Sequence, residues 1–199
     1  MSVIDILIGF VFGILSSTLV SAVWPKLFLP SIKFSNIISK KESTENNETF
    51  CYRIKFRNDG KRDIFEMKIY STILLCDFPR SGSNHTINLK TSYCFNPVFK
   101  KRKSGKRTNP DAIVRFVLND EELKKELRRP IYPEKIRIQA KKSLITLEDI
   151  LSICPNSYIK IFIIAHDSFT GNKKIFESKE YTQSDIVYGE YKIGKLTVV

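Results

Sequence analysis

The sequence contains few of the residues from which catalytic and metal sites are built. It has two histidines and four cysteines, and no two cysteines form a CxxC pair. It also lacks a Gly-rich phosphate-binding loop, so neither a metal site nor a nucleotide site is recognisable. His166, Asp167 and Ser168 are consecutive, whereas catalytic groups must converge through folding, so we interpret them as part of a turn closed by residues 170–172. The sequence therefore predicts no enzyme, no cofactor and no metal site.

Lysine and arginine are absent from the first 25 residues, where Asp5 is the one charged side chain. A secretory signal peptide normally opens with Lys or Arg, so one of its defining features is missing. Residues 20–22, Val-Ser-Ala, do offer the small side chains that a signal peptidase accepts. We therefore favour an uncleaved anchor, with a cleaved signal as the alternative.

A long apolar run occupies the N-terminal region. Ile6 to Trp24 gives 19 residues without a charged side chain. At about 1.5 Å per residue they reach roughly 28 Å as a helix, close to the thickness of a bilayer's hydrocarbon core. Trp24 and Lys26 suit the membrane interface at the end of the run. The sequence predicts one transmembrane helix, with residues 1–30 forming the anchor and an interfacial linker.

Small residues recur every fourth position within this run, at Gly9, Gly13, Ser17 and Ser21. Such spacing places them on one face of a helix, where two backbones can approach closely and serine hydroxyls can bond across the contact. Gly and Ser are also common in membrane spans in general, so composition alone is the alternative. We predict that the helix self-associates into a homo-oligomer.

Positive charge follows the span closely, at Lys26, Lys33, Lys40 and Lys41. By the positive-inside rule this predicts a single-pass protein of the inner (plasma) membrane, with its N-terminus outside and residues 31–199 in the cytoplasm. Cysteines without close spacing agree with thiols kept reduced. The four are Cys51, Cys76, Cys94 and Cys154.

The chain carries 33 Lys and Arg against 21 Asp and Glu, a net charge of +12. Six cations without an acid cluster in one segment: Lys100, Lys101, Arg102, Lys103, Lys106 and Arg107. For a tethered domain, we predict that they contact the phosphates of anionic lipid, although a solvated loop is an equal alternative. Nucleic acid is disfavoured because no aromatic residues are interleaved and no groove-reading motif surrounds the cluster.

Period-two alternation dominates the rest of the chain, as in FCYRIKFRN, where Phe50, Tyr52, Ile54 and Phe56 share one face. Strands are predicted at 31–39, 50–58, 64–75, 86–90, 112–118, 135–140, 158–165, 173–181 and 190–199, with a turn at 58–60. Short helices are predicted at 119–129, with Glu121, Glu122 and Glu126 on a solvated face, and at 146–153, with a capping box. The pattern predicts a mainly β protein with an antiparallel β-sandwich of eight to ten strands.

Three stretches resemble the cytoplasmic domain of inward-rectifier potassium channels. Two are SIKFSNIIS, at 31–39, and YRIKFRNDGKRDIFEMKIYSTILL, at 52–75. The third is YTQSDIVYGEYKIG, where the matching residues are Tyr181, Asp185, Ile186, Tyr188 and Gly189. The resemblance implies an immunoglobulin-like sandwich attached to a membrane helix, which in the channels forms a ring and senses intracellular ligands. A single span without a pore loop excludes conduction by the channel mechanism.

Three functional hypotheses follow. The first is a membrane effector or sensor, in which the cytoplasmic domain responds to a ligand or partner and the self-associating span perturbs the bilayer, an architecture analogous to bacterial antiviral and toxin effectors. The second is a membrane-tethered scaffold or adaptor. The third is a regulatory subunit of a larger membrane complex.

Overall fold

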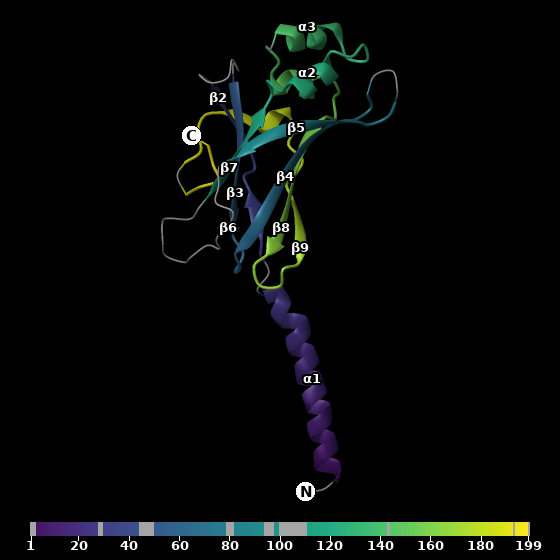
Figure 1. The fold of residues 1–199 in the computed structure, drawn as a ribbon, viewed down its shortest axis with the longest axis vertical. Helices are drawn as coiled ribbons and strands as arrows, with labels where there is room; N and C mark the ends of the chain where they lie inside the picture. The colour runs from purple at the N-terminus through teal and green to yellow at the C-terminus, as the bar shows by residue number, and fades with distance from the viewer. Residues whose placement is uncertain are drawn as a thin grey trace.

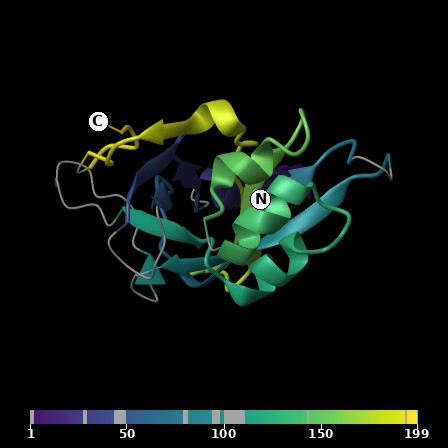
Figure 2. The same ribbon diagram turned by 90° about the horizontal axis from the view of Figure 1, so that it is seen from above.

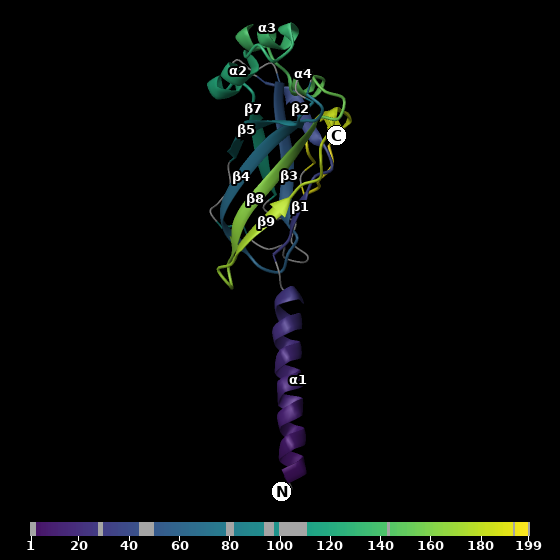
Figure 3. The same ribbon diagram turned by 90° about the vertical axis from the view of Figure 1, so that its right-hand side faces the viewer.

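A long N-terminal helix extends away from a β-rich domain in the computed structural model (Figures 1 and 3). The structure describes residues 3–27, 30–43, 50–78, 82–93, 98–99, 111–142, 144–192 and 194–198. The helix, α1, runs from Val3 to Leu27, and its span Val3–Ser21 is long and apolar enough to cross a membrane. None of that span is buried against the remainder of the chain, which we call the β-domain.

Ten strands and three short α-helices are described in the β-domain. The strands are β1 (Ile32–Phe34), β2 (Ile38–Glu42), β3 (Phe50–Asn58), β4 (Ile64–Leu75), β5 (His85–Tyr93), β6 (Val98–Phe99), β7 (Ala112–Val117), β8 (Tyr158–Asp167), β9 (Lys173–Glu177) and β10 (Ile186–Tyr188). The helices are α2 (Glu121–Leu127), α3 (Glu134–Lys142) and α4 (Leu147–Leu151), with a 3₁₀ turn, η1, at Gln183–Asp185. The chain is therefore mainly β after α1, as predicted.

The strands form one curled, mixed sheet in the order β10-β2-β3-β7-β5-β4-β8-β9, with β1 on β3 and β6 on β4. Strand β5 is shared between two halves. Its first part pairs with β4, as in Leu89 opposite Ser71, and its last part pairs with β7, as in Lys90 opposite Val117. The pairing of β10 with β2 is parallel, and the other strand pairs are antiparallel, which agrees with the largely antiparallel arrangement that the sequence predicted.

Alternation along each strand explains the core. In β8, Ile159, Ile161, Ile163 and Ala165 are buried, while the residues between them are partly exposed. Ile73 of β4 lies directly opposite Ile159 and is also fully buried. Because side chains alternate across a strand, one face of the curled sheet supplies the apolar interior.

The prediction of a strand at 135–140 was wrong, because this segment lies in α3. Ile136 and Ala140 are the buried residues of α3, at the i, i+4 spacing of a helix face, whereas Ile138 is exposed. Pro133 precedes the helix, and its carbonyl accepts the Arg137 amide at 3.1 Å. The Ile-x-Ile alternation is short enough to fit either the two-residue period of a strand or the 3.6-residue period of a helix.

Three other predicted strands were wrong in extent. The strand predicted at 173–181 ends at Glu177, and Tyr181 forms an isolated bridge. Segment 31–39 is divided into β1 and β2, which both pair antiparallel with β3. In the described part of 190–199, one isolated bridge joins Tyr191 to Val198, and Gly194 between them has a φ of 70°. Glycine adopts this left-handed conformation without strain. The turn leaves too few residues on either side to form a strand.

The short helices gather at the end of the domain farthest from α1 (Figures 1 and 2). The predicted capping box of α4 is confirmed, since the Asp149 amide donates to Thr146 Oγ1 at 3.1 Å and the Thr146 amide donates to Asp149 at 3.2 Å. Helix α4 is held to the sheet by its Glu148, which pairs with Lys40 of β2 at 2.6 Å and accepts the Tyr52 hydroxyl. Burial, followed by the Glu148 contact, raises the pKa of Tyr52, so this group stays protonated and structural.

Candidate functional site

Helix α1 presents apolar side chains to solvent on all sides. Phe10, Phe12, Leu15 and Leu19 are among its exposed large hydrophobic residues. Soluble domains rarely leave a contiguous apolar surface of this length uncovered, and a helix that is apolar all round belongs in a lipid or protein interior. The helix is therefore the first candidate functional element.

The predicted small-residue stripe is open in the isolated chain. A Cβ added at Gly9 or Gly13 would meet no atom within 4 Å outside the helix's own backbone. The Ser17 hydroxyl donates to the Ile14 carbonyl at 2.9 Å, and the Ser21 hydroxyl donates to the Thr18 carbonyl at 3.0 Å. Both hydroxyls are therefore hydrogen-bonded within α1. The helix can enter hydrocarbon without a partner helix to accept these hydrogen bonds.

Two other predicted sites cannot be placed. Trp24 and Lys26 lie within α1, but their side chains are outside the described residues. The basic cluster at Lys100–Arg107 also lies outside the described residues.

The chain leaving α1 is fixed to the turn between β3 and β4. The amides of Asp59 and Gly60 donate to the Ser31 carbonyl at 2.8 and 3.1 Å. A Cβ at Gly60 would lie 2.3 Å from the Ser31 nitrogen and 2.7 Å from the Pro30 Cα. Only glycine permits this approach, so the predicted turn at 58–60 also serves as the attachment point of the linker.

A buried ion pair links this turn to the turn between β8 and β9. Arg62 Nη1 lies 2.9 Å from Asp167 Oδ2, and the two side chains are 10% and 2% exposed. The Ser168 amide also donates to the Asp63 carbonyl at 3.1 Å. The two turns therefore form one unit at the end of the domain nearest α1 (Figures 1 and 3).

Asp167 organises the β8–β9 turn from its centre. Its carboxylate accepts the Phe169 amide at 3.2 Å and the Thr170 hydroxyl at 2.9 Å. Burial alone would raise the pKa of Asp167, but the hydrogen bonds from Phe169, Thr170 and Arg62 outweigh burial and hold this pKa below its ordinary value. The carboxylate is thus a charged structural group.

The interpretation of residues 166–172 as a turn is confirmed from Ser168 onward, whereas His166 and Asp167 are the last residues of β8. His166 Nδ1 lies 3.1 Å from the Gly171 carbonyl, and Gly171 has a φ of 68°. Sequence reasoning nevertheless missed Phe169, which lies at the turn with 76% of its surface exposed. The Arg62 guanidinium carbon lies 4.5 Å from the Phe169 ring centroid. The sequence signal was an aromatic residue placed inside a polar turn.

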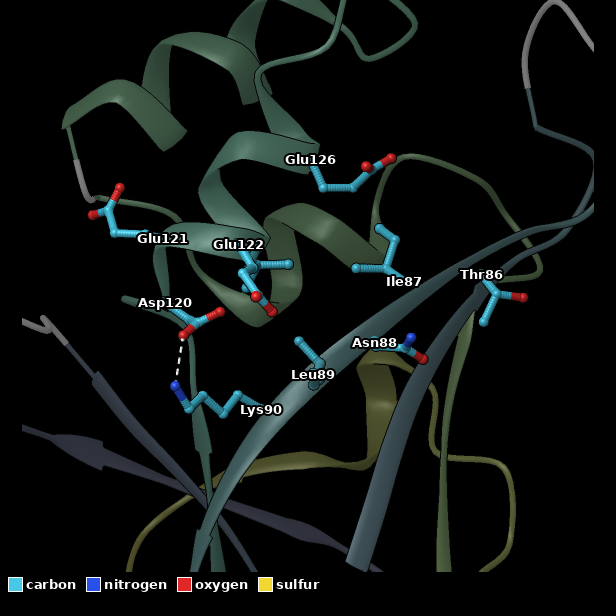
Figure 4. Close-up of a pocket in the computed structure, with 10 residues that line it drawn as sticks. Thr86, Ile87, Asn88, Leu89, Lys90, Asp120, Glu121, Glu122 and Glu126 are labelled. Carbon is cyan, nitrogen blue, oxygen red and sulfur yellow. Dashed lines mark hydrogen bonds and ion pairs between the residues drawn. The ribbon is translucent and has the colours of Figure 1, made fainter.

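A groove of about 570 Å³ lies between β5 and α2 (Figure 4). Lys90 of β5 pairs across it with Asp120 at 3.1 Å, and Glu121 pairs with the buried Lys124 at 2.9 Å. Glu126 pairs with Arg129 at 2.8 Å and lies 3.3 Å from His85. Of the three glutamates predicted on a solvated face, Glu121 and Glu126 are therefore engaged in ion pairs.

Three of the four carboxylates that line this groove are paired with cations. No group of three or more His, Cys, Asp or Glu that could hold a metal occurs among the described residues. Of the described cysteines, Cys51, Cys76 and Cys154, the last two carry free thiols, and burial raises the pKa of Cys154. A thiol in this state is a poor nucleophile. The fourth, Cys94, lies outside the described residues.

No family model matches the sequence, and no curated protein matches it either. The resemblance to the inward-rectifier domain therefore stays an expectation from the sequence. Helix α1 and the end of the domain to which it connects are the candidate functional elements.

Proposed function

We propose that this protein is a membrane-anchored, non-enzymatic effector or sensor, in which α1 crosses the bilayer and self-associates while the β-domain responds to a ligand or partner. The observation that carries the proposal is the exposed apolar surface of Val3–Ser21, none of which the β-domain covers. Leaving a leucine-sized side chain in water costs about 1.5–3 kcal/mol relative to burial, so a run of such residues needs an apolar environment.

Self-association is supported by the geometry of the stripe. Gly9 and Gly13 leave a gap in the side-chain surface that α1 itself does not fill. In a bilayer the hydrophobic effect no longer drives helices together, so close backbone packing at small residues becomes the main source of affinity. The hydroxyls of Ser17 and Ser21 already donate within α1, so packing at the glycines supports self-association more strongly than hydrogen bonds between helices do.

An immunoglobulin-like sandwich is the finer fold that we propose for the β-domain. In support, β5 pairs with β4 and then with β7, as a strand does when it turns the corner between two packed sheets. The C-terminal segment that carries the resemblance also spans both halves. Tyr181 bridges to Ile159 of β8, and its hydroxyl donates to the Ser35 carbonyl at 2.5 Å, while Tyr188 pairs with Lys40 of β2.

We expect the β-domain to lie in the cytoplasm, because lysines follow α1 and none precedes it. A reporter that is active only in the cytoplasm, fused after Val199, should be active, and the same reporter fused before Met1 should not. Activity of an externally active reporter at Val199, or a mature N-terminus at Val23, would contradict this orientation.

The effector proposal is tested with Gly13→Ile. The substitution keeps α1 apolar but fills the gap between helices, so we expect self-association to weaken about tenfold, equivalent to ~1.4 kcal/mol, with insertion unchanged. Crosslinking in membranes measures association, and a potential-sensitive dye in overexpressing cells measures depolarisation, which should fall in parallel.

Phe12→Ile is the matched control, because residue 12 lies about 100° around the helix from residue 13 and is already large. If the two variants weaken self-association equally, the small residues reflect only the composition of the helix and do not form its contact face. Intact association without depolarisation in the wild-type protein would instead favour the scaffold hypothesis.

A further inference from the structure

We propose that the β8–β9 turn, tipped by Phe169 and flanked by lysines, is a second membrane contact that holds the β-domain against an anionic lipid surface. The inference rests on the proposed function, because it requires α1 to span the bilayer.

The distance from α1 to the domain is short. Three residue steps separate Leu27, where α1 ends, from Pro30, so their Cα atoms lie at most about 11 Å apart. Pro30 and Ser31 in turn lie against Gly60. If α1 spans the bilayer, the β3–β4 turn is therefore within reach of the lipid headgroups.

Phe169 is held near the lipid headgroups as well, because the β8–β9 turn is fixed to the β3–β4 turn. The Arg62–Asp167 pair and the hydrogen bond from Ser168 to Asp63 join the two turns, so the β8–β9 turn cannot move independently of the linker site. Inside the turn, Asp167 accepts the amide of Phe169 itself. Both views place the tip of this turn at the level of the C-terminal end of α1 (Figures 1 and 3).

Phe169 is an exposed ring on a structured support. A single exposed hydrophobic side chain is common on soluble proteins. Phe169 differs because its own backbone is anchored by the buried Asp167 and because its ring contacts the Arg62 guanidinium. A polar turn that fixes an aromatic ring outward, at the end of the domain nearest α1, matches the interfacial position that aromatic residues prefer in membranes.

The charge around the tip favours anionic lipid. Four lysines lie on this end of the domain, Lys33 on β1, Lys61 on the β3–β4 turn, and Lys173 and Lys174 at the start of β9. The acidic residues on the same turns and strand ends are Asp59, Asp63, Glu66 and Asp167. Asp59 pairs with Arg57, Asp167 pairs with Arg62, and Glu66 lies 4.0 Å from His166. The balance is positive, and the cytoplasmic leaflet attracts such a surface.

The test uses the full chain reconstituted in vesicles that contain phosphatidylglycerol. Because Trp24 is the one tryptophan, a Trp24→Phe background carries either Phe169→Trp or, as the matched control, Tyr188→Trp on β10. Tyr188 is also exposed, and it pairs with Lys40, which contacts α4 at the far end of the domain. We expect brominated acyl chains to quench the tryptophan introduced at position 169 at least about twofold more than the one introduced at position 188, with a blue-shifted emission.

Charge reversal separates lipid electrostatics from apolar insertion. Lys61→Glu with Lys173→Glu should reduce the quenching at position 169 in anionic vesicles and change it little in neutral ones. Resistance to alkaline extraction reports insertion of α1 independently. If the chain inserts but positions 169 and 188 are quenched equally, this inference is overturned and the anchor stands. If the chain does not insert, both are overturned.

Discussion

Arginine at both Ile14 and Leu15 is expected to release the protein from the membrane. The two positions lie in the middle of the Val3–Ser21 span. An arginine near the centre of a transmembrane helix costs about 2.5–3.5 kcal/mol, so the pair costs roughly 5–7 kcal/mol and removes two apolar side chains as well. The wild-type chain should stay in the membrane pellet after alkaline carbonate extraction, and the double variant should move to the supernatant.

Alanine at the same two positions is the matched control. It removes the same two large apolar side chains without adding charge, so Ile14→Ala with Leu15→Ala should remain in the pellet. Depolarisation by overexpressed protein should be lost with the arginines and kept with the alanines. Retention of the arginine variant in the pellet would contradict a spanning role for α1.

Replacing Asp167 by alanine is expected to lower the free energy of unfolding by about 3–5 kcal/mol, because it leaves the guanidinium of Arg62 buried without its partner. The turn around Phe169 also loses the acceptor that organises it. Denaturant unfolding of the full chain in detergent measures the change. The matched control is Glu190→Ala, which removes an exposed ion pair with Lys41 and should shift the midpoint little.

The same residue predicts a pH dependence. The pKa of Asp167 is lower in the folded state, so its contribution to stability is complete above the unfolded pKa of about 3.9 and is lost as the pH falls through the folded pKa. The stability difference between the wild type and Asp167→Ala should therefore be constant from pH 7 to about pH 5 and should shrink below pH 4. A difference that is unchanged at pH 3 would contradict this assignment.

Strands and the long apolar N-terminal helix could be predicted because their signals are local. Each depends on a run of apolar residues whose period is visible in the sequence, as in β3 and β8. The strand predicted at 135–140 failed because Ile136 and Ile138 alternate over too few residues to distinguish a strand from the buried face of α3. The division of β5 between β4 and β7 depends on strand partners far along the chain, so no local pattern indicated it.

The candidate membrane-facing end was only partly predictable. The turns at 58–60 and 166–172 follow from their Asn, Asp and Gly residues. The contact between the two turns could not be predicted, because the Arg62–Asp167 pair joins residues separated by 105 positions. The exposed ring of Phe169 likewise suggests a membrane contact only when α1 is known to leave the domain at the same end.

The close fit of Pro30 and Ser31 on Gly60 limits how copies of the protein can meet. Two helices joined at glycines pack with axes about 8–10 Å apart, which is too close for two β-domains to stand side by side. Gly13 lies about 21 Å along the axis from Leu27, and helices that cross there at about 40° are offset at Leu27 by ~14 Å at right angles to the first separation, so that their axes lie ~17 Å apart there. The glycines thus lie in the half of α1 farther from the β-domain, where contact lets the two chains separate before they reach their domains, and a dimer would have the outline of a V that opens toward the β-domains.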